Sequence, residues 1–530
     1  MFHPLAEKWF SETYGKPTKV QAEAWPLIAA GEHVLALAPT GSGKTLTAFM
    51  GAISRFIDGT YSAQALSVLY VSPLKALNED IRRNLLEPIA SLGILFEKEG
   101  AAFPDIRVET RSGDTPQTQR RRFMVKPPAI LALTPESLAI LLLNPKGRQV
   151  LSTVRYVILD EIHAALGTKR GAFLSCQIDR LGLAASEFQR VALSATVRPP
   201  EEAAAFVGGL GPEGPRPVRI VAPPAEKRIE VLVDFPPANA AEIGAEWKKA
   251  DRYGPRYSAL IDAVLERLGI GASGGGGERR VTADENRRPH TVLVFTDSRQ
   301  RAERIAFLIN RQAGEAGAEQ QIAYTHHGSL SKEMRQAVER RLAEGRLPCV
   351  VATGSLELGI DIGSVDEVIL AGTPGSAATA LQRLGRSGHG VGLTSRGRII
   401  PFHGMDLVAA AALSSAIGEK EIEEIRAIEN PLDVLAQIVL ALCVEKKRHT
   451  DELYQTLRGF YVFRNLDRPS YDGVIRMLTG HYASARIREL KPRLFLDREP
   501  GTDALRGELS AADGTQSLLY LSGGVIANRG

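Results

Sequence analysis

A glycine-rich loop between a buried strand and a helix constrains the fold of this chain more than any other feature. The loop Ala38–Thr45 reads APTGSGKT. It follows the apolar run HVLALA, which begins at His33, and precedes the amphipathic run LTAFMGAISRFI. Glycines in such a loop let backbone N–H groups surround phosphates at a helix N-terminus. The pattern predicts a nucleotide-binding loop in an α/β fold, although Ala38 stands where the general pattern has glycine.

The loop has predicted roles in binding ATP and Mg²⁺. Lys44 would reach the β- and γ-phosphates, and the Thr45 hydroxyl would ligate Mg²⁺. The other loop positions predicted to bind the nucleotide are Thr40, Gly41, Ser42 and Gly43. Upstream, Gln21 lies at a predicted helix start, where its amide could read the adenine edge with two hydrogen bonds.

A carboxylate pair in the sequence DEIH follows the apolar run YVIL. Acidic residues at a strand end beside a phosphate loop suit a metal ligand and a residue that polarises the attacking water. Asp160 is the predicted Mg²⁺ ligand, and Glu161 is the residue predicted to act on the water. His163 either links the nucleotide state to a second domain or is a structural histidine.

Short apolar runs alternate with amphipathic stretches in two successive series, as in parallel sheets with crossover helices. The first series closes near residue 215 at a stretch rich in proline and glycine, and the second ends before residue 420. Residues 271–289 interrupt the second series. They are poor in apolar residues and are predicted to form a flexible surface insertion, with a basic RNA-binding loop as the alternative.

The composition indicates a globular protein and excludes several classes. The formal net charge is +4, with 65 Lys and Arg against 61 Asp and Glu, so any basic binding surface must be local. Three widely spaced cysteines argue against a disulfide framework or a zinc site. The N-terminus lacks a signal-peptide pattern, and the longest apolar stretch, Val434–Val444, is too short to cross a bilayer. We therefore expect a cytoplasmic protein without a membrane partner.

Ten short motifs occur in one order and resemble those of superfamily-two helicases. The series is APTGSGKT, SPLKAL, RSGDT, TPES, DEIH, SAT, VFTDSR, HHGSLS, ATGSLELGID and QRLGRSGH. The forms DEIH, HHGSLS, SLELGID and QRLGRSGH are similar to the Lhr-like (large helicase-related) branch. The later segments NPLDVLAQ, from Asn430, and YDGVIRML, from Tyr471, resemble that branch's winged-helix domain.

The resemblance implies a fold class and a domain order. It implies an α/β protein with two tandem RecA-like domains that contain parallel sheets, followed by a mostly helical winged-helix domain. The predicted limits are 1–215 for the first RecA-like domain, 216–418 for the second and 419–500 for the winged-helix domain. Residues 501–530 resemble the start of a further domain, so the chain looks shorter than the family's full length.

The resemblance also implies roles for single residues. Gln382 and Arg386 would act on ATP from the second domain, with Arg386 as the arginine finger, and Asp361 would lie near the ribose. His389 stands where many members of the superfamily have a second arginine. The residues implied to contact the backbone of a single strand are Pro73, Lys75, Arg111, Thr134, Thr296, Thr353 and Ser355. A cap or turn is the alternative role for each Thr or Ser.

These features predict an ATP-dependent helicase or translocase that acts on single-stranded DNA or RNA and on tailed duplexes. By resemblance, it would move 3′→5′ and unwind DNA or RNA:DNA duplexes in nucleic-acid repair or processing. The alternative is an ATP-gated RNA-binding remodeller without processive stepping. Protein partners are not predicted.

The segment from Lys446 to Arg498 carries twelve Lys and Arg against six Asp and Glu. Tyrosine and phenylalanine rings are interspersed among these charges, which suits a module that contacts a strand. The alternative is a winged-helix domain whose rings form its own core.

Overall fold

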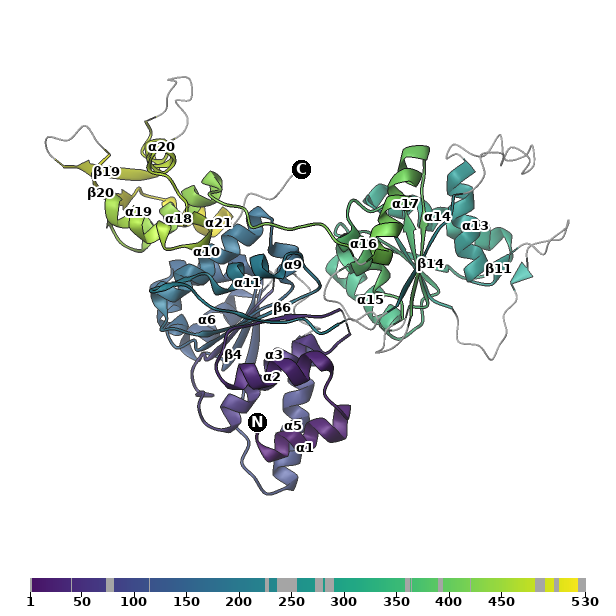
Figure 1. Cartoon of the computed structure of the whole chain (residues 1–530), viewed down its shortest axis with the longest axis horizontal. Coiled ribbons are helices and arrows are strands. Elements are labelled where there is room, and N and C mark those ends of the chain that lie inside the picture. The colour runs from purple at the N-terminus through teal and green to yellow at the C-terminus, as the bar shows by residue number, and fades with distance from the viewer. Residues whose placement is uncertain are drawn as a thin grey trace. The chain divides into compact units, whose positions relative to one another are not determined.

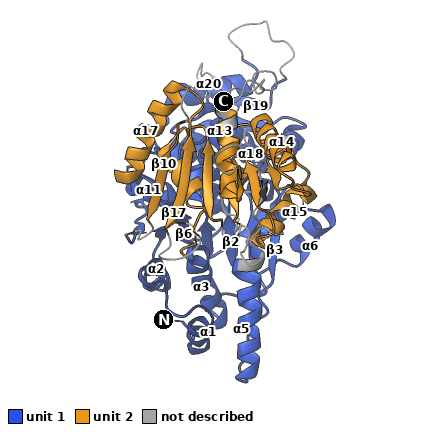
Figure 2. Ribbon diagram, turned by 90° about the vertical axis from the view of Figure 1, so that its right-hand side faces the viewer, with its two compact units in different colours: residues 1–38, 43–223, 424–530 blue, residues 39–42, 224–423 orange. Residues whose placement is uncertain are grey.

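The computed structural model divides the chain into two compact units. Unit 1 comprises residues 1–38, 43–223 and 424–530, and unit 2 comprises residues 39–42 and 224–423 (Figure 2). The residues that the structure describes are 2–39, 41–72, 81–113, 115–224, 228–235, 255–271, 280–281, 290–357, 363, 365–388, 394–419, 421–481, 491–499 and 505–522.

Unit 1 contains a seven-stranded parallel sheet with the order β3-β4-β2-β5-β6-β1-β9 (Figure 1). The strands are β1 (Val34–Leu37), β2 (Val68–Val71), β3 (Val108–Arg111), β4 (Ile130–Leu133), β5 (Tyr156–Leu159), β6 (Gln189–Ser194) and β9 (Arg219–Val221). The apolar runs become central strands because successive side chains point to opposite faces, and both faces are covered. In β1, for example, Val34 and Ala36 join one core, whereas Leu35 and Leu37 join the other.

Helices pack on both faces of this sheet. The first core includes residues of α1 (Pro4–Tyr14), α2 (Lys19–Ala29), α3 (Lys44–Ile57) and α5 (Glu87–Lys98). The helices that contribute to the other core are α6 (Gln117–Val125), α7 (Pro135–Leu143), α8 (Pro145–Leu151), α9 (Ile162–Ala165), α10 (Lys169–Ala184) and α11 (Pro200–Gly208). The π-helix η1 (Arg82–Leu86) precedes α5, and the short strands β7 (Leu210–Gly211) and β8 (Gly214–Pro215) form a hairpin.

The C-terminal segment belongs to unit 1 and has the elements of a winged helix. Its helices are α18 (Leu432–Glu445), α19 (Thr450–Arg458), η4 (Tyr461–Phe463), α20 (Arg468–Leu478) and α21 (Thr515–Ser522). Its antiparallel sheet has the order β18-β20-β19, with β18 (Arg448–His449), β19 (Leu494–Arg498) and β20 (Gly507–Ala511).

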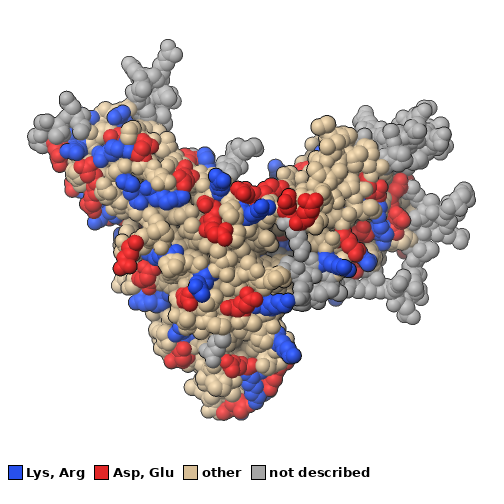
Figure 3. All heavy atoms as spheres, in the orientation of Figure 1, with Lys and Arg blue, Asp and Glu red and all other residues tan. Residues whose placement is uncertain are grey.

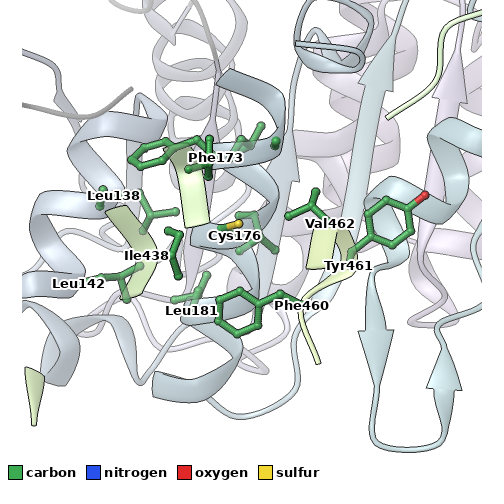
Figure 4. Packing of buried hydrophobic residues seen from close by; sticks show 14 of the residues in the cluster. Leu138, Leu142, Phe173, Cys176, Leu181, Ile438, Phe460, Tyr461 and Val462 are labelled. Carbon is green, nitrogen blue, oxygen red and sulfur yellow. The ribbon is translucent and has the colours of Figure 1, made fainter. Parts of the chain in front are cut away.

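The C-terminal segment shares one hydrophobic core with the first α/β domain. Ile438 of α18 and Phe460 lie among side chains from α7 and α10, such as Leu142 and Leu181 (Figure 4). A polar contact also joins the C-terminal segment to α10. The Asp179 carboxylate of α10 accepts a hydrogen bond of 3.0 Å from the Tyr461 N–H. The sequence pattern predicted a third domain, but it did not predict that this domain would pack on the first.

Unit 2 contains a six-stranded parallel sheet with the order β10-β17-β16-β13-β15-β14. The strands are β10 (Ile229–Val233), β13 (Val292–Phe295), β14 (Ala323–His326), β15 (Cys349–Ala352), β16 (Glu367–Ala371) and β17 (Ser395–Ile400). One face packs against α13 (Pro255–Arg267) and α14 (Arg299–Glu315). The other face packs against α15 (Lys332–Ala343), α16 (Ala377–Leu384) and α17 (Gly404–Glu419), and the short 3-10 helix η3 (Gly354–Leu356) follows β15. The predicted fold class of two parallel α/β domains and a winged helix is confirmed.

The sheets extend beyond the predicted domain limits. Strand β9 lies after residue 215 but pairs with β1, so the first sheet continues past that limit. Strand β20 lies after residue 500 but is the central strand of the winged-helix sheet, so that sheet also continues. Within the predicted insertion, β12 (Arg280–Val281) pairs with β11 (Ile270–Gly271), and residues 272–279 and 282–289 lie outside the described residues.

Among the described residues, no helix has the length and apolar character needed to cross a membrane. The three cysteines, Cys176, Cys349 and Cys443, are buried and are not in disulfides.

Candidate functional site

The sheet order of unit 1 separates two groups of predicted site residues. The predicted strand contacts of this unit follow β3, β4 and β2 in the chain, whereas the carboxylate pair and the phosphate loop follow β5 and β1. Because the carboxyl ends of parallel strands meet at one edge of a sheet, both groups belong to that edge. The tertiary structure therefore places the two groups on adjacent halves of one edge.

The phosphate loop has the backbone that its glycines permit. Gly41 and Gly43 have φ values of 80° and 79°, a region that disfavours residues with a Cβ. The helix α3 begins at Lys44, whose buried ammonium donates to the Ala38 carbonyl oxygen, and Thr45 follows in the first turn. Thr40 lies outside the described residues.

Gln21 links the loop to the preceding helix. Its Oε1 accepts a hydrogen bond of 2.9 Å from the Thr18 N–H, and its Nε2 donates to the Gly43 carbonyl oxygen at 3.3 Å. A Cβ at position 43 would lie 2.7 Å from that Nε2, so a side chain there would displace the Gln21 amide, and the φ of 79° itself favours glycine. The amide predicted to read adenine therefore also holds the phosphate loop.

The carboxylate pair at the end of β5 is buried. Asp160 Oδ1 accepts a hydrogen bond of 2.8 Å from the Glu161 N–H, and Oδ2 accepts one from the Tyr70 hydroxyl of β2. Burial and the Glu161 carboxylate both raise the pKa of Asp160, and the ammonium of Lys44 opposes them. Glu161 has a φ of 50°, a strained value for a residue with a side chain.

The same carboxylate pair fits a divalent cation. A bound Mg²⁺ would stabilise the Asp160 carboxylate, whose charge is disfavoured by burial and by the neighbouring Glu161, and carboxylate and hydroxyl oxygens are ligands that Mg²⁺ prefers. Asp160 and Thr45 are the residues of this chain that would hold it.

His163 connects DEIH to the strand that ends in SAT. The Ala195 N–H donates to His163 Nδ1 at 3.1 Å, and the same nitrogen lies 3.4 Å from a carboxylate oxygen of Glu161. The His163 N–H in turn donates to the Ser194 hydroxyl at 3.2 Å. These contacts lie within unit 1 and connect the carboxylate pair to the end of β6.

The predicted ATP residues of unit 2 lie on and after α16. Gln382 is in the last turn of this helix and is partly exposed. Arg386 follows the helix, is 2% exposed and donates to the Glu357 carbonyl oxygen. The nearby Arg383 binds the Glu357 carboxylate and stacks on an aromatic ring of β13. Asp361 and His389 lie outside the described residues.

Two predicted strand contacts of unit 1 are described, and both are buried. Arg111, at the end of β3, is 6% exposed, and its guanidinium carbon lies 4.9 Å from the centroid of the Phe123 ring. Thr134 is the N-cap of α7, and its hydroxyl accepts a hydrogen bond of 3.4 Å from the Ser137 N–H, as the cap alternative predicts. Pro73 and Lys75 lie outside the described residues.

In unit 2, a buried histidine organises the turn that contains two predicted strand contacts. The His326 carbonyl oxygen accepts hydrogen bonds from the Thr353 N–H at 3.2 Å and from the Ser355 hydroxyl at 3.0 Å. Its ring Nδ1 lies 2.8 Å from the same hydroxyl, and Nε2 lies 2.8 Å from a carboxylate oxygen of Glu339. Thr296, by contrast, is fully buried.

Sequence reasoning missed Tyr70, His326 and Glu339. His326 stands in the motif HHGSLS, so the motif was a signal, but its contact with Ser355 spans 29 positions. Tyr70 and Asp160 are 90 positions apart and meet because β2 and β5 are neighbours in the sheet.

Many cations of the basic C-terminal segment are already paired. Arg468 binds Asp472 at 2.8 Å and also binds Asp451, and Lys447 lies 3.3 Å from Glu508. Basic and acidic side chains are interspersed on the face in Figure 3. The rings of Phe460, Tyr461, Phe463 and Tyr471 are buried. The rings thus belong to the core, and the charge available to phosphates is smaller than the composition indicates.

Three families match successive parts of the chain. Residues 18–204 match the DEAD/DEAH box helicase family, and residues 278–390 match the helicase conserved C-terminal domain. Residues 415–530 match the winged helix domain of large helicase-related protein.

Two relatives illustrate the similarity over the whole chain. The Lhr helicase/probable uracil glycosylase of Mycolicibacterium smegmatis is 39% identical over 100% of this chain and 35% of its own length. The ATP-dependent helicase Lhr-Core protein 2 of Thermococcus barophilus is 38% identical over 99% of this chain and 57% of its own length. The chain thus spans about a third to just over half of the length of these relatives.

The structure is similar to that of Mycobacterium smegmatis helicase Lhr bound to ssDNA and AMP-PNP. The TM-score is 0.83 at 39% identity, over 100% of this chain and 63% of the other. A second structure, DUF1998 helicase MrfA bound to DNA, has a TM-score of 0.70 at 21% identity over 98% of this chain and 64% of the other, and it shows similarity of fold alone.

Proposed function

Because this chain belongs to the Lhr-like, large helicase-related family of superfamily-two helicases, we propose that it is an ATP-dependent nucleic-acid helicase. The observation that carries the proposal is the order of strands in unit 1. In this order, the strands that precede the phosphate loop and the carboxylate pair lie in one half of the sheet. The strands that precede the predicted strand contacts of unit 1 lie in the other half. An enzyme that couples ATP hydrolysis to movement along a strand needs a mechanical connection between its ATP site and its strand site, and a shared sheet edge would supply one.

Hydrolysis would use the residues of the phosphate loop and of β5. Backbone N–H groups of Thr40–Gly43 and the ammonium of Lys44 would bind the phosphates. Mg²⁺, held by Thr45 and Asp160, would neutralise phosphate charge. Glu161 would orient and polarise the attacking water, and the Tyr70 hydroxyl would fix the Asp160 carboxylate.

Unit 2 would complete the chemistry. Arg386 would stabilise charge in the transition state as an arginine finger, with Gln382 and Asp361 also contacting the nucleotide. In this structure the Arg386 Nη2 donates to the Glu357 carbonyl oxygen of its own unit.

The strand would be held through its backbone by Pro73, Lys75, Arg111, Thr134, Thr353 and Ser355. Thr296, the other predicted contact, is fully buried in this structure. Hydroxyls, backbone amides and cations bind phosphates without reading bases, as translocation requires. Since the M. smegmatis structure holds ssDNA, we propose single-stranded DNA as the loading strand, movement 3′→5′, and unwinding of DNA or RNA:DNA duplexes in repair or processing.

Unwinding of tailed duplexes tests this proposal. Duplexes with a 3′ or a 5′ tail are made with DNA and RNA exchanged strand by strand, and Lys44→Ala serves as the inactive control. We expect ATP-dependent unwinding only with a 3′ DNA tail. Unwinding of short duplexes without a dependence of ATP turnover on tail length would favour the RNA remodeller instead, and unwinding by Lys44→Ala would refute the ATP site.

A further inference from the structure

Helix α6 carries three exposed cations whose side chains have no ion pair or hydrogen bond within the described part of the chain. These residues are Arg121, Arg122 and Lys126, the last being the C-cap of the helix. They belong to a local surplus, since nine Lys and Arg occur against three Asp and Glu between Arg107 and Arg155. The surplus of six positive charges equals the surplus in the basic C-terminal segment, Lys446 to Arg498.

Other cations of unit 1 are neutralised by partners. Arg216 binds Glu187 at 2.8 Å, and Arg170 binds Glu136 at 2.7 Å. Lys169 binds Asp433 at 2.7 Å. The α6 cations therefore differ in pairing from Arg216, Arg170 and Lys169 of the same unit. An unpaired cation contributes more to polyanion binding, because it gives up no ion pair when it binds a phosphate.

The helix is attached to the loop that follows β3. Arg120 of α6 donates from Nη2 to the Gly113 carbonyl oxygen at 2.6 Å and to the Ser112 carbonyl oxygen at 3.3 Å. Phe123, the buried residue of α6, lies beneath the Arg111 guanidinium. Thus α6 packs beneath Arg111, the residue proposed to bind the strand. The first exposed cation of the helix, Arg121, follows directly after Arg120, which contacts the loop.

The Arg111 guanidinium itself favours a nearby anion. Burial and the charge of Arg120 lower its pKa to about 10, which means that its positive charge is disfavoured there. The guanidinium packs on an aromatic ring, and no carboxylate within the described residues pairs with it. A phosphate beside Arg111 would stabilise this charge and would lie next to α6.

A groove lies between β3 and α6. Its volume is about 660 Å³. Its lining combines the polar side chains of Thr110, Thr118, Gln119 and Arg122 with the Glu109 carboxylate and with the apolar side chains of Ile81, Leu86, Val108 and Pro116. Hydroxyl, amide and guanidinium donors suit a sugar-phosphate backbone.

We propose that α6 extends the strand-binding surface of unit 1, with Arg121, Arg122 and Lys126 binding phosphates of a single strand beyond those held by the motif residues. The contacts are to phosphate and are independent of base sequence. The proposal rests on the proposed function, because it takes the strand at Arg111 as its starting point. It adds a set of contacts that the motif series does not contain.

The salt dependence of strand binding tests the proposal. Fluorescence anisotropy measures the affinity of the full chain for single-stranded oligo-dT of increasing length at several salt concentrations. The test variant is Arg122→Gln/Lys126→Gln. The matched control is Lys16→Gln/Lys98→Gln, which removes two exposed cations of unit 1 that also have no partner within the described residues.

For long oligonucleotides, the slope of log K against log salt should fall by about 0.7 for each phosphate that is no longer neutralised, or about 1.4 for the test variant. The control should keep the parent slope, and the shortest oligonucleotides that bind should show no difference. If the test variant and the control variant have equal slopes of log K against log salt on long oligonucleotides, the proposal is overturned. If the parent chain itself neither binds the strand nor hydrolyses ATP, the proposed function fails instead.

Discussion

Removing residues 424–530 should destabilise the first α/β domain, because the C-terminal segment completes its core. Leu138 and Leu142 of α7 and Phe173 and Leu181 of α10 are between 0% and 3% exposed in the intact chain. They share a cluster with residues of α18 and η4. A chain that ends at Glu423 would expose these faces of α7 and α10 to water.

The magnitude follows from burial. Each large apolar side chain contributes about 1.5–3 kcal/mol when fully buried, so exposing these four would cost up to about 6–12 kcal/mol. That range is comparable to the whole stability of a typical domain, about 5–15 kcal/mol. We therefore expect the shortened chain to aggregate, or to melt at least about 10 °C below the full chain.

Thermal melting and light scattering of the full and shortened chains measure this effect. A point substitution tests the same reasoning without deletion. Ile438→Ala, at a residue 1% exposed in α18, should cost about 2–4 kcal/mol. Leu432→Ala in the same helix, at a residue 47% exposed, should cost less than about 1 kcal/mol. A monomeric 1–423 chain that melts within a few degrees of the parent would refute the reasoning.

Three further predictions concern single residues. Glu161→Gln should lower single-turnover ATP hydrolysis by about 100-fold or more while strand affinity is retained; normal turnover would remove its proposed role. His326→Asn should weaken strand binding, whereas the control His327→Asn should not, because His327 contacts Glu303. Adding Ser355→Ala to His326→Asn should weaken strand binding little further. Additive effects of the two substitutions would show that His326 does not act through Ser355. Burial raises the pKa of Asp179 to about 6, so the folded protein binds a proton at this carboxylate more tightly than the unfolded chain does. The contribution of Asp179 to the free energy of unfolding is therefore greatest below pH about 4. Up to about 3 kcal/mol of this free energy is lost as the pH rises through 6. Asp179→Asn should flatten this part of the pH profile in denaturant unfolding, and an unchanged profile would contradict the prediction.

The amino-acid sequence by itself determined the local features of the nucleotide site. The strand, loop and helix around Ala38–Thr45 are contiguous, so glycine spacing and hydrophobic pattern are sufficient to define them. The same holds for the alternation of apolar runs and helices, because a strand covered on both faces must be apolar throughout. The fold class could therefore be predicted, and the order of motifs identified the family.

The tertiary structure decided which distant residues meet. The contacts of Asp160 with Tyr70 and of Ser355 with His326 depend on which strands are neighbours, and strand order has no local signal in the sequence. Composition likewise overstated the charge of the C-terminal segment, since pairs such as Lys447 with Glu508 form only after folding.

The position of the C-terminal segment also depended on tertiary packing. Helix α18 is apolar on several sides, which predicts burial but does not identify the partner surface. Its packing on α7 and α10 follows from complementary apolar faces that lie far apart in the chain. Lys169 and Asp433, which form an ion pair beside these faces, are 264 positions apart. Contacts over such separations arise from the shape of the folded domain, because no short-range pattern in the sequence specifies them.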